Sequence, residues 1–399
     1  MPADGGPALV GAGRLSFAGG AAGRAAQANM AKIFLSMSGE GRGHATRVRA
    51  LVEALAADHT VRVFAPGDAH AFLAPLYAET GVEVERLPGL CFAYNGRQRL
   101  SYPATFGRLV RYLRELPATL DRLTAAFERE RPDLAIADFE PALPRAARRC
   151  GVPYLSVDHQ HFLRTYDLSS LPARLRWRAA YMGWIVGTFY SGQVETVVSS
   201  FYFAPLRRGC RRVTQVGVLL RPEVRAARAE VGGHLVAYWR KFVDECVLQA
   251  LEQTGLQVRV YGLGARPPRG RMTFHPVSEK QFLADLAGCR ALVCTAGNQL
   301  VGEALYLGKP VLALAETNNF EQEINGHFLQ ASGAGVAMPM SRFTAGDLHG
   351  FLAGLDQFRR RIRPERLDGL PEVLAVLQRH LPERRHAPRR VPVPQLVAA

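Results

Sequence analysis

The sequence has few cysteines, only six in 399 residues, and no two of them are spaced as Cys-x-x-Cys. We therefore expect reduced thiols and, with them, a cytoplasmic protein, with peripheral attachment to the inner face of the membrane left open. The sequence also shows no internal repeat of roughly 30–50 residues. Its hydrophobic content of 48% is ordinary for α/β proteins.

The aromatic-rich segment at residues 171–190 has an apolar part that is too short to span a bilayer. That part is twelve residues long, whereas a spanning helix needs about 20. Arginines at positions 174, 176 and 178 lead into Trp, Tyr, Met and Phe side chains, a combination suited to a membrane–water interface. A buried helix whose arginines reach solvent explains the pattern equally well. The sequence leaves both interpretations open.

Acidic residues are scarce relative to basic ones, 35 against 50, so the formal net charge is +15. Ten arginines but only four acidic residues lie between residues 358 and 390. Basic surfaces attract nucleic acid or anionic lipid headgroups. Because this stretch has neither interleaved aromatic residues nor a recognised nucleic-acid-binding module, we expect no nucleic-acid partner. An anionic membrane surface stays among the expected partners.

The length and the alternation of strand-like and helix-like segments predict two α/β domains. We expect an amino-terminal domain at residues 30–204 and a carboxy-terminal domain at 211–378, joined by a short linker. Residues 1–29 are rich in Ala and Gly and precede a second methionine, and residues 379–399 are rich in Arg and Pro. Both ends are expected to be disordered, as an amino-terminal extension and a basic tail.

The most informative motif lies at residues 295–303, Thr-Ala-Gly-Asn-Gln-Leu-Val-Gly-Glu. An apolar run before it predicts a buried strand, and the spacing after Gly297 predicts a helix. A glycine at such a turn lets main-chain N–H groups approach a phosphate at the helix N-terminus. We expect Glu303 to be an exposed carboxylate that binds the ribose hydroxyls. Glu321 and Gln322 follow the next predicted strand, at the sheet edge where ligands of open α/β sheets bind.

The amino-terminal half carries matching features. Residues 32–44 predict a strand followed by a glycine-rich turn that ends in Gly41-Arg-Gly-His44. A histidine within such a turn has no obvious packing role, so we favour a functional one. Two further predicted strands end in polar residues, at Asp138-Phe-Glu140 and at Asp158-His-Gln-His161. A metal site at the second cluster is one alternative, and a histidine that braces the sheet end is another.

These motifs resemble the GT-B glycosyltransferases of families 1 and 28, and a little-characterised prokaryotic group described as teichoic-acid-biosynthesis-like. The resemblance runs from about residue 32 to about residue 339. It implies an α/β fold with two Rossmann-like domains facing a central cleft. It also implies that Gly297 contacts the diphosphate, Glu303 the ribose, and Glu321 with Gln322 the sugar. Family 1 enzymes usually have a phosphate-binding histidine where this sequence has Thr295.

The implied activity is that of an inverting, metal-independent transferase. It would move a sugar from a nucleoside-diphosphate donor, expected to be a UDP-sugar, to a sugar or lipid-linked hydroxyl acceptor. No cofactor is expected. One alternative is a nucleotide-sugar 2-epimerase of the same fold, and another is a polyanion-binding protein without enzymatic activity. Retention of configuration is not excluded by the sequence.

The residues expected at the site fall into three groups. The catalytic candidates are His44, Asp138, Glu140 and Asp158. The donor-binding candidates are Gly41, Gly43, Thr295, Gly297, Asn298, Gln299, Glu303, Glu321 and Gln322. The acceptor-binding candidates are Phe139, His159 and His161, and no metal ligand is expected.

Overall fold

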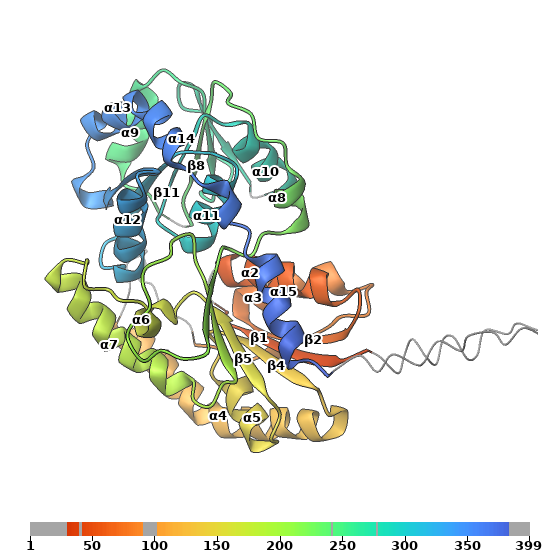
Figure 1. Ribbon diagram of the computed structural model, residues 1–399. Helices are drawn as coiled ribbons and strands as arrows, with labels where there is room; N and C mark the ends of the chain where they lie inside the picture. The colour runs from red at the N-terminus through yellow and green to blue at the C-terminus, as the bar shows by residue number, and fades with distance from the viewer. Residues whose placement is uncertain (1–29, 40–41, 91–101, 241, 277, 383–399) are drawn as a thin grey trace, which may run out of the picture.

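The computed structural model describes residues 30–39, 42–90, 102–240, 242–276 and 278–382. Within them, the chain forms two parallel sheets, each flanked by helices, so the α/β fold of two Rossmann-like domains is confirmed. Figure 1 shows the two domains one above the other, with the amino-terminal domain in red to green.

The first sheet has seven strands in the order β3-β2-β1-β4-β5-β6-β7. Their bounds are β1 Lys32–Met37, β2 Thr60–Pro66, β3 Glu83–Leu87, β4 Leu134–Asp138, β5 Tyr154–Asp158, β6 Glu195–Ser199 and β7 Val213–Val216. The helices between them are α2 Arg42–Leu55, α3 Gly67–Tyr77, α4 Tyr102–Glu130, α5 Ala142–Arg149, α6 Phe162–Thr165 and α7 Ala173–Phe189. The order reverses between β1 and β4, and in such sheets ligands bind at the carboxyl ends of the strands on either side of the reversal.

The second sheet has six strands in the order β10-β9-β8-β11-β12-β13. The strands are β8 Leu235–Tyr238, β9 Val258–Tyr261, β10 Met272–His275, β11 Ala291–Cys294, β12 Val311–Ala315 and β13 Gly335–Pro339. The helices are α8 Pro222–Ala226, α9 Glu245–Gln253, α10 Glu279–Gly288, α11 Asn298–Tyr306, α12 Phe320–Ser332, α13 Ala345–Ala353, α14 Leu355–Arg361 and α15 Leu370–His380, with short 3₁₀ turns at Met340–Arg342 and Pro364–Arg366. Here the order reverses between β8 and β11.

Apolar burial explains the layers of the amino-terminal domain. One face of the first sheet packs with α2 and α3 in a core that includes Val48, Leu51 and Leu73. The opposite face packs with α4 and α5 in a core that includes Leu123 and Ala146. A third core contains residues of both domains, so the two sheets do not fold around separate interiors. No helix in the described residues is long and apolar enough to cross a membrane.

The domain boundary differs from the one expected at residues 204–211. Strand β7 lies beyond that boundary, yet it pairs in parallel with β6 in the first sheet. Helix α15 comes after the second domain, yet Val373, Val376 and Leu377 are buried in the core of the first. The chain therefore passes between the domains twice. A sequence pattern cannot reveal this return, because α15 looks like any amphipathic helix.

The two crossings contact each other directly. Val218 pairs with Asp368 as an isolated parallel bridge, and the Gly369 amide donates a hydrogen bond to the Val218 carbonyl at 3.0 Å. A Cβ atom on Gly217 would lie 2.5 Å from the Leu367 carbonyl carbon, closer than side chains tolerate. Glycine is therefore required where the crossings meet.

The packing of α15 predicts that Leu377→Ala destabilises the whole protein by about 2–4 kcal/mol, because it empties a site in the core of the first domain. Thermal or urea unfolding of the full chain would measure the loss. Gln378→Ala, on the exposed side of the same helix, is the matched control and should change stability little. Equal effects of the two substitutions would contradict the docking of α15.

Candidate functional site

The N-termini of two helices, one from each domain, lie next to each other at the carboxyl ends of the sheets. Helix α2 follows β1, and α11 follows β11, so both begin beside the point where their sheet reverses its strand order. A Cβ atom on Gly43 would lie 3.8 Å from the Gln299 Cβ atom. Figure 1 shows α2 and α11 facing each other across the domain boundary. Gly41 lies outside the described residues.

His44, near the start of α2, is paired with Asp138 at the end of β4. The His44 Nδ1 atom lies 2.9 Å from Asp138 Oδ1. The Asp138 side chain is 1% exposed and that of His44 is 12% exposed, so the carboxylate is buried behind the ring. If Nδ1 donates its hydrogen to the carboxylate, Nε2 carries the lone pair and can accept a proton. Two of the expected catalytic residues therefore form a hydrogen-bonded pair.

Arg47 binds the same carboxylate oxygen, a contact that the sequence did not reveal. Its Nη1 atom donates to Asp138 Oδ1 at 2.8 Å, and the side chain is 3% exposed. A buried carboxylate is costly unless it is paired, so this positive charge compensates Asp138. Arg47 lies one turn after His44 on α2, and that spacing is the only signal in the sequence that links the two.

Phe139 occupies a strained backbone conformation directly after Asp138. Its φ angle is +54°, in the left-handed region that non-glycine residues rarely adopt. Its ring stacks on the His44 ring with a centroid distance of 6.3 Å and also contacts Phe189 at 5.4 Å. Strain of this kind gathers at functional sites, where it aims particular side chains. Here it positions an aromatic ring beside His44.

Glu140 and Asp158 are fully engaged with their own loops. Glu140 accepts hydrogen bonds from the amides of Ala142 and Leu143, at 2.7 and 2.9 Å, and so caps α5. Burial raises the pKa of Glu140 above its ordinary value, although these two bonds oppose the shift. Asp158 accepts bonds from Ser156 Oγ at 2.7 Å and from the His161 amide at 2.9 Å. Neither carboxylate is exposed by more than 2%, so both are enclosed by the segments that they bond.

The electrostatics of Asp158 come from its histidine neighbour. Burial alone would raise the pKa of this carboxyl. The positive charge of His161 and the hydrogen bonds to it outweigh burial, so the pKa of Asp158 is lowered to about 2. His161 Nδ1 lies 2.8 Å from Asp158 Oδ2, and its ring is 3% exposed. Within the described residues, no group of three or more His, Cys, Asp or Glu side chains could hold a metal ion.

His159 is buried between the two domains rather than exposed to the cleft. Its Nδ1 atom lies 3.1 Å from the Ser199 carbonyl oxygen, and its Nε2 atom lies 3.1 Å from Asn325 Oδ1 on α12. Burial, together with the positive charge of Arg47, lowers the pKa of His159 to about 3. The ring is therefore neutral at neutral pH.

Two asparagine side chains complete this contact between the domains. Asn298 Nδ2 donates to the Ser199 carbonyl at 3.1 Å, while its Oδ1 accepts from the Phe201 amide at 3.2 Å. Asn325 accepts from Tyr202 Oη at 3.1 Å and donates to the Ala296 carbonyl at 2.9 Å. Asn298, expected to bind the donor, thus connects the carboxyl end of β6 to the start of α11.

Glu303 lies on α11 but is not the exposed carboxylate expected from the sequence. It is 3% exposed, and its oxygens accept from Gln299 Nε2 at 3.0 Å and from Arg221 Nη2 at 3.4 Å. Arg221 comes from the first crossing between the domains, so its position could not be read from the motif. It also bonds to Glu279 at 2.9 Å. This cation compensates the buried carboxylate in place of solvent.

The turn around Gly297, before α11, is open. Gly297 caps α11 in an extended conformation, and a Cβ atom on it would meet no described atom within 4 Å. Thr295 precedes it at the end of β11 and is 8% exposed. The start of α11 therefore leaves room beside Gly297, and helix N-termini attract anions such as phosphate.

Glu321 and Gln322 lie in the first turn of α12, directly after β12. The Gln322 side chain accepts from the Glu316 amide at 2.7 Å and donates to Glu316 Oε2 at 3.2 Å. Glu321 Oε2 lies 3.5 Å from Gln160 Nε2 of the first domain. Both side chains are half-buried. Glu316, which the sequence motif did not single out, thus joins the pair at the end of β12.

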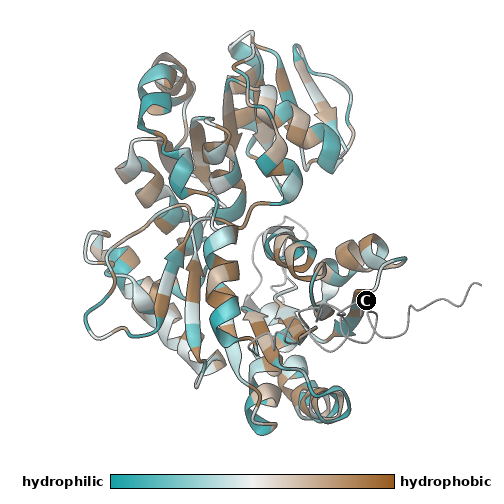
Figure 2. Cartoon of the chain, turned by 45° about the vertical axis from the view of Figure 1, so that its right-hand side comes forward, coloured by the Kyte–Doolittle hydropathy of each residue, from teal (hydrophilic) through white to brown (hydrophobic). Residues whose placement is uncertain are grey.

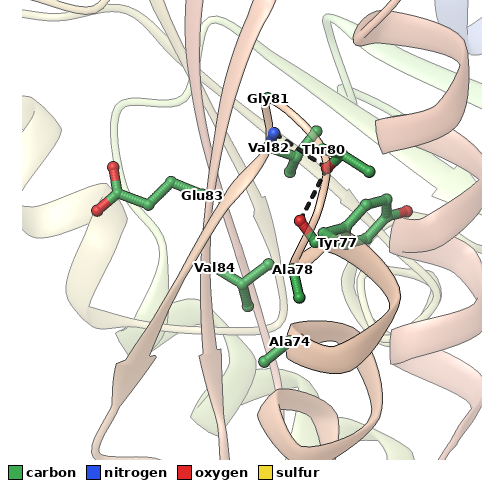
Figure 3. A pocket seen from close by; sticks show the side chains of 8 residues that line it. All are labelled: Ala74, Tyr77, Ala78, Thr80, Gly81, Val82, Glu83 and Val84. Atoms are coloured by element: carbon green, nitrogen blue, oxygen red, sulfur yellow. Dashed lines mark hydrogen bonds between the residues drawn. The ribbon is translucent and has the colours of Figure 1, made fainter.

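One depression on the described surface lies away from these residues. It is lined by the end of α3 and the start of β3, including Tyr77, Thr80 and Glu83 (Figure 3). The Thr80 hydroxyl there donates to the Tyr77 carbonyl at 2.9 Å and accepts from the Val82 amide at 3.2 Å. These bonds form a local turn, and no residue of the motifs takes part, so we assign it no function.

Comparisons with known proteins agree with this geometry. A family model described as glycosyl transferase family 1 matches residues 31–356. No match was found among curated proteins. Similar solved structures include the glycotransferase of kitacinnamycin, with 17% identity and a TM-score of 0.62, covering 88% of this chain and 100% of that one.

Two further solved structures have the same fold. Phytolacca americana UGT2, solved with UDP-2fluoro-glucose and pterostilbene, has 13% identity and a TM-score of 0.65, covering 87% of this chain and 98% of its own. MurG of Acinetobacter baumannii has 14% identity and a TM-score of 0.55, covering 88% and 99%. At such identities the likeness concerns the fold, which is GT-B.

The buried, neutral His159 predicts that the protein loses stability in mild acid. The unfolded chain takes up a proton near the ordinary histidine pKa of about 6.5, whereas the folded chain does so only near 3. The unfolded state therefore binds more protons between these values, and this residue contributes a loss of about 1.4 kcal/mol per pH unit as pH falls. Unfolding of the wild type and of His159→Gln between pH 7 and 4 would measure it.

His159→Gln should flatten this dependence, although it also costs stability at neutral pH. His349→Gln, at an exposed position on α13, is the control and should leave the dependence unchanged. If His159→Gln does not reduce the slope of stability against pH, the loss of stability in acid does not come from His159.

Proposed function

The chain belongs to glycosyl transferase family 1, and from this premise we propose that it is an inverting glycosyltransferase that needs no metal ion. Its donor in this proposal is a nucleoside-diphosphate sugar, with uridine as the nucleoside, and its acceptor carries a hydroxyl. One observation carries the proposal. The His44–Asp138 pair stands at the start of α2, where Gly43 adjoins Gln299 of the donor helix.

The donor binds along α11. Its diphosphate lies against the open turn at Gly297, where main-chain N–H groups and the positive end of the helix favour anions. Thr295 can donate a hydrogen bond but supplies no charge. Arg221 is held by Glu279 and Glu303, so the positive end of the helix, rather than this arginine, stabilises the diphosphate. The ribose hydroxyls bind Glu303, and Gln299 keeps its carboxylate in place.

The sugar lies toward α12. Glu321 and Gln322 are half-buried in the first turn of that helix and accept or donate hydrogen bonds to the sugar hydroxyls. Gln322 is held by Glu316, which fixes the amide orientation before the sugar arrives. Preorganised partners of this kind lower the cost of binding.

The chemistry then needs one base and one stabiliser of the leaving group. His44 takes the proton of the acceptor hydroxyl at Nε2 while the oxygen attacks the anomeric carbon. The bond from that carbon to the diphosphate breaks on the opposite face, so the configuration inverts. Amide groups at the start of α11 stabilise the charge that develops on the diphosphate. Asp138 holds the His44 ring and stabilises its protonated form, and Arg47 keeps Asp138 compensated.

The acceptor side is built around Phe139. Its ring lies beside His44 and is only partly buried, so it offers an apolar surface to the acceptor. His159 is buried between the two domains and His161 is buried against Asp158, so both support the acceptor site without touching the ligand. We propose that the acceptor is a lipid-linked hydroxyl compound and that an anionic membrane surface lies near it.

We expect His44→Ala to reduce kcat by roughly 10²–10⁴-fold while the dissociation constant of the donor stays nearly unchanged, because a general base acts in the transition state. Transfer of radiolabelled sugar to product and calorimetric titration of the donor would measure the two quantities. His349→Ala, at an exposed position on α13, is the control. Near-normal turnover of a folded His44→Ala protein would remove the histidine from the mechanism.

Glu303→Gln should weaken donor binding by about 1.5–3 kcal/mol, the range for a hydrogen bond to a charged group. Glutamine is chosen because alanine would leave Arg221 without its buried partner. A loss of stability would then be mixed with the loss of donor binding. Glu279→Gln is the matched control, since it removes the other carboxylate of Arg221 but touches no part of the proposed donor site. Equal losses in both variants, measured by calorimetry, would show that Glu303 acts only through Arg221.

A further inference from the structure

One face of α7 exposes three large aromatic side chains to solvent. Trp177, Tyr181 and Trp184 are 79%, 64% and 67% exposed. Their spacing of four and three residues places them on one side of the helix. The opposite side, with Leu175, Ala179 and Val186, is buried in the core that joins the domains. Solitary exposed apolar residues are common, but an aligned stripe of aromatic residues marks an interaction surface.

Positive charge flanks this stripe. Arg176 is exposed on α7 and Arg178 is half-buried beside Trp177, while the exposed Arg174 is paired with Glu323. The Arg176 guanidinium donates to the carbonyls of Ser169 and Leu171, at 3.2 and 3.3 Å. These acceptors are neutral, so they leave the positive charge of Arg176 uncompensated. Aromatic residues with polar edges next to arginines are typical of surfaces that lie in the headgroup region of a membrane.

Helix α4 carries a second stripe of the same kind in the same layer of the domain. Phe106, Leu109 and Leu113 are exposed, at 66%, 38% and 53%, and their spacing also places them on one side of the helix. Arg111 and Arg114 are exposed on the same turns. Phe189, at the end of α7, and Leu116 of α4 pack against one core cluster, and Figure 1 shows both helices on the lower side of the amino-terminal domain.

The α7 stripe is also close to the cleft. Arg174 forms an ion pair with Glu323 on α12, two residues after Glu321. The buried side of α7 contacts α6, which follows directly after His161. A ligand that approaches along α7 therefore reaches the first turn of α12, which is proposed to bind the sugar.

We infer that the exposed faces of α7 and α4 dock this protein on an anionic lipid bilayer. The aromatic side chains enter the headgroup region and the arginines bind lipid phosphates, with α7 parallel to the membrane plane. This orientation brings the acceptor side of the cleft to the bilayer. The purpose of docking, access to a lipid-linked acceptor, rests on the proposed function. Membrane binding itself can be tested separately.

The other occupants of such a face are a second copy of the chain and a partner protein. Charge argues against a second copy, because two faces that each carry arginines would repel. The chain as a whole has a net charge of +15, which matches an anionic surface. The stripes lie on the convex sides of helices rather than in a groove, which suits a fluid surface that adapts its shape.

The test uses the full-length chain and vesicles of phosphatidylcholine with or without phosphatidylglycerol. Sedimentation should show binding that grows with phosphatidylglycerol content and falls as salt rises, because headgroup attraction is screened beyond about 8 Å at physiological ionic strength. Tryptophan fluorescence gives a second signal. Of the three tryptophans, Trp177 and Trp184 are exposed and Trp239 is fully buried, so vesicles should shift the emission to shorter wavelength.

The variant Trp177→Ser/Trp184→Ser should reduce vesicle partitioning by roughly tenfold or more and abolish the spectral shift, since it removes interfacial apolar area. Phe242→Ser, an exposed aromatic of the other domain, is the matched control and should bind like wild type. Arg111→Glu should weaken binding at low salt, whereas Arg360→Glu on α14 should not.

Donor titration of the same proteins separates this inference from the proposed function. Wild-type donor binding without vesicle binding at low salt would overturn the docking and leave the function standing. Vesicle binding without donor affinity would overturn the proposed function and leave the docking standing. Loss of a dimer in Trp177→Ser/Trp184→Ser, measured by light scattering, would assign the face to a second copy and overturn the membrane proposal.

Discussion

The contact made by two buried asparagines and a histidine keeps the carboxyl ends of the two sheets together. Asn298 and Asn325 begin or lie on helices of the second domain, and His159 follows a strand of the first. Each amide satisfies backbone groups that burial would otherwise leave unpaired, which is costly in the absence of water. Because these partners have fixed geometry, they also fix the distance between α2 and α11. The distance between His44 and the start of α11 depends on this contact.

The buried carboxylates near the cleft are each bonded to partners. Few of them are therefore available to act as a base or an acid. Asp138 faces both His44 and Arg47, and Glu303 faces Arg221. Glu140 and Asp158 are saturated by their own loops. Among the carboxylates that the sequence brought forward, Asp138 alone is paired with a partly exposed histidine. That pairing separates a candidate for catalysis from carboxylates that hold the loops in shape.

Much of the fold could be predicted from the sequence, because strand, glycine turn and helix follow one another with clear periodicity. The start of α11 at Gly297 and the strand before it were identified correctly for this reason. The roles of Arg47, Arg221 and Glu316 could not be predicted. Their importance arises from partners that folding brings near, such as Asp138 for Arg47, 91 residues away. The burial of Glu303 has the same origin, since Arg221 reaches it from a segment with no recognisable motif.

The paired crossings at Gly217 and Gly369 have a mechanical consequence. When one linker joins two domains, the domains can rotate about the linker as well as move apart, because a single chain limits only the distance between them. Here two segments run side by side, bonded between Val218 and Gly369. Such a double connection favours rotation about one axis and resists the others, as expected of a hinge. Because His159, Asn298 and Asn325 also hold the two domains together, the double connection and this buried contact keep the two helix N-termini in one register.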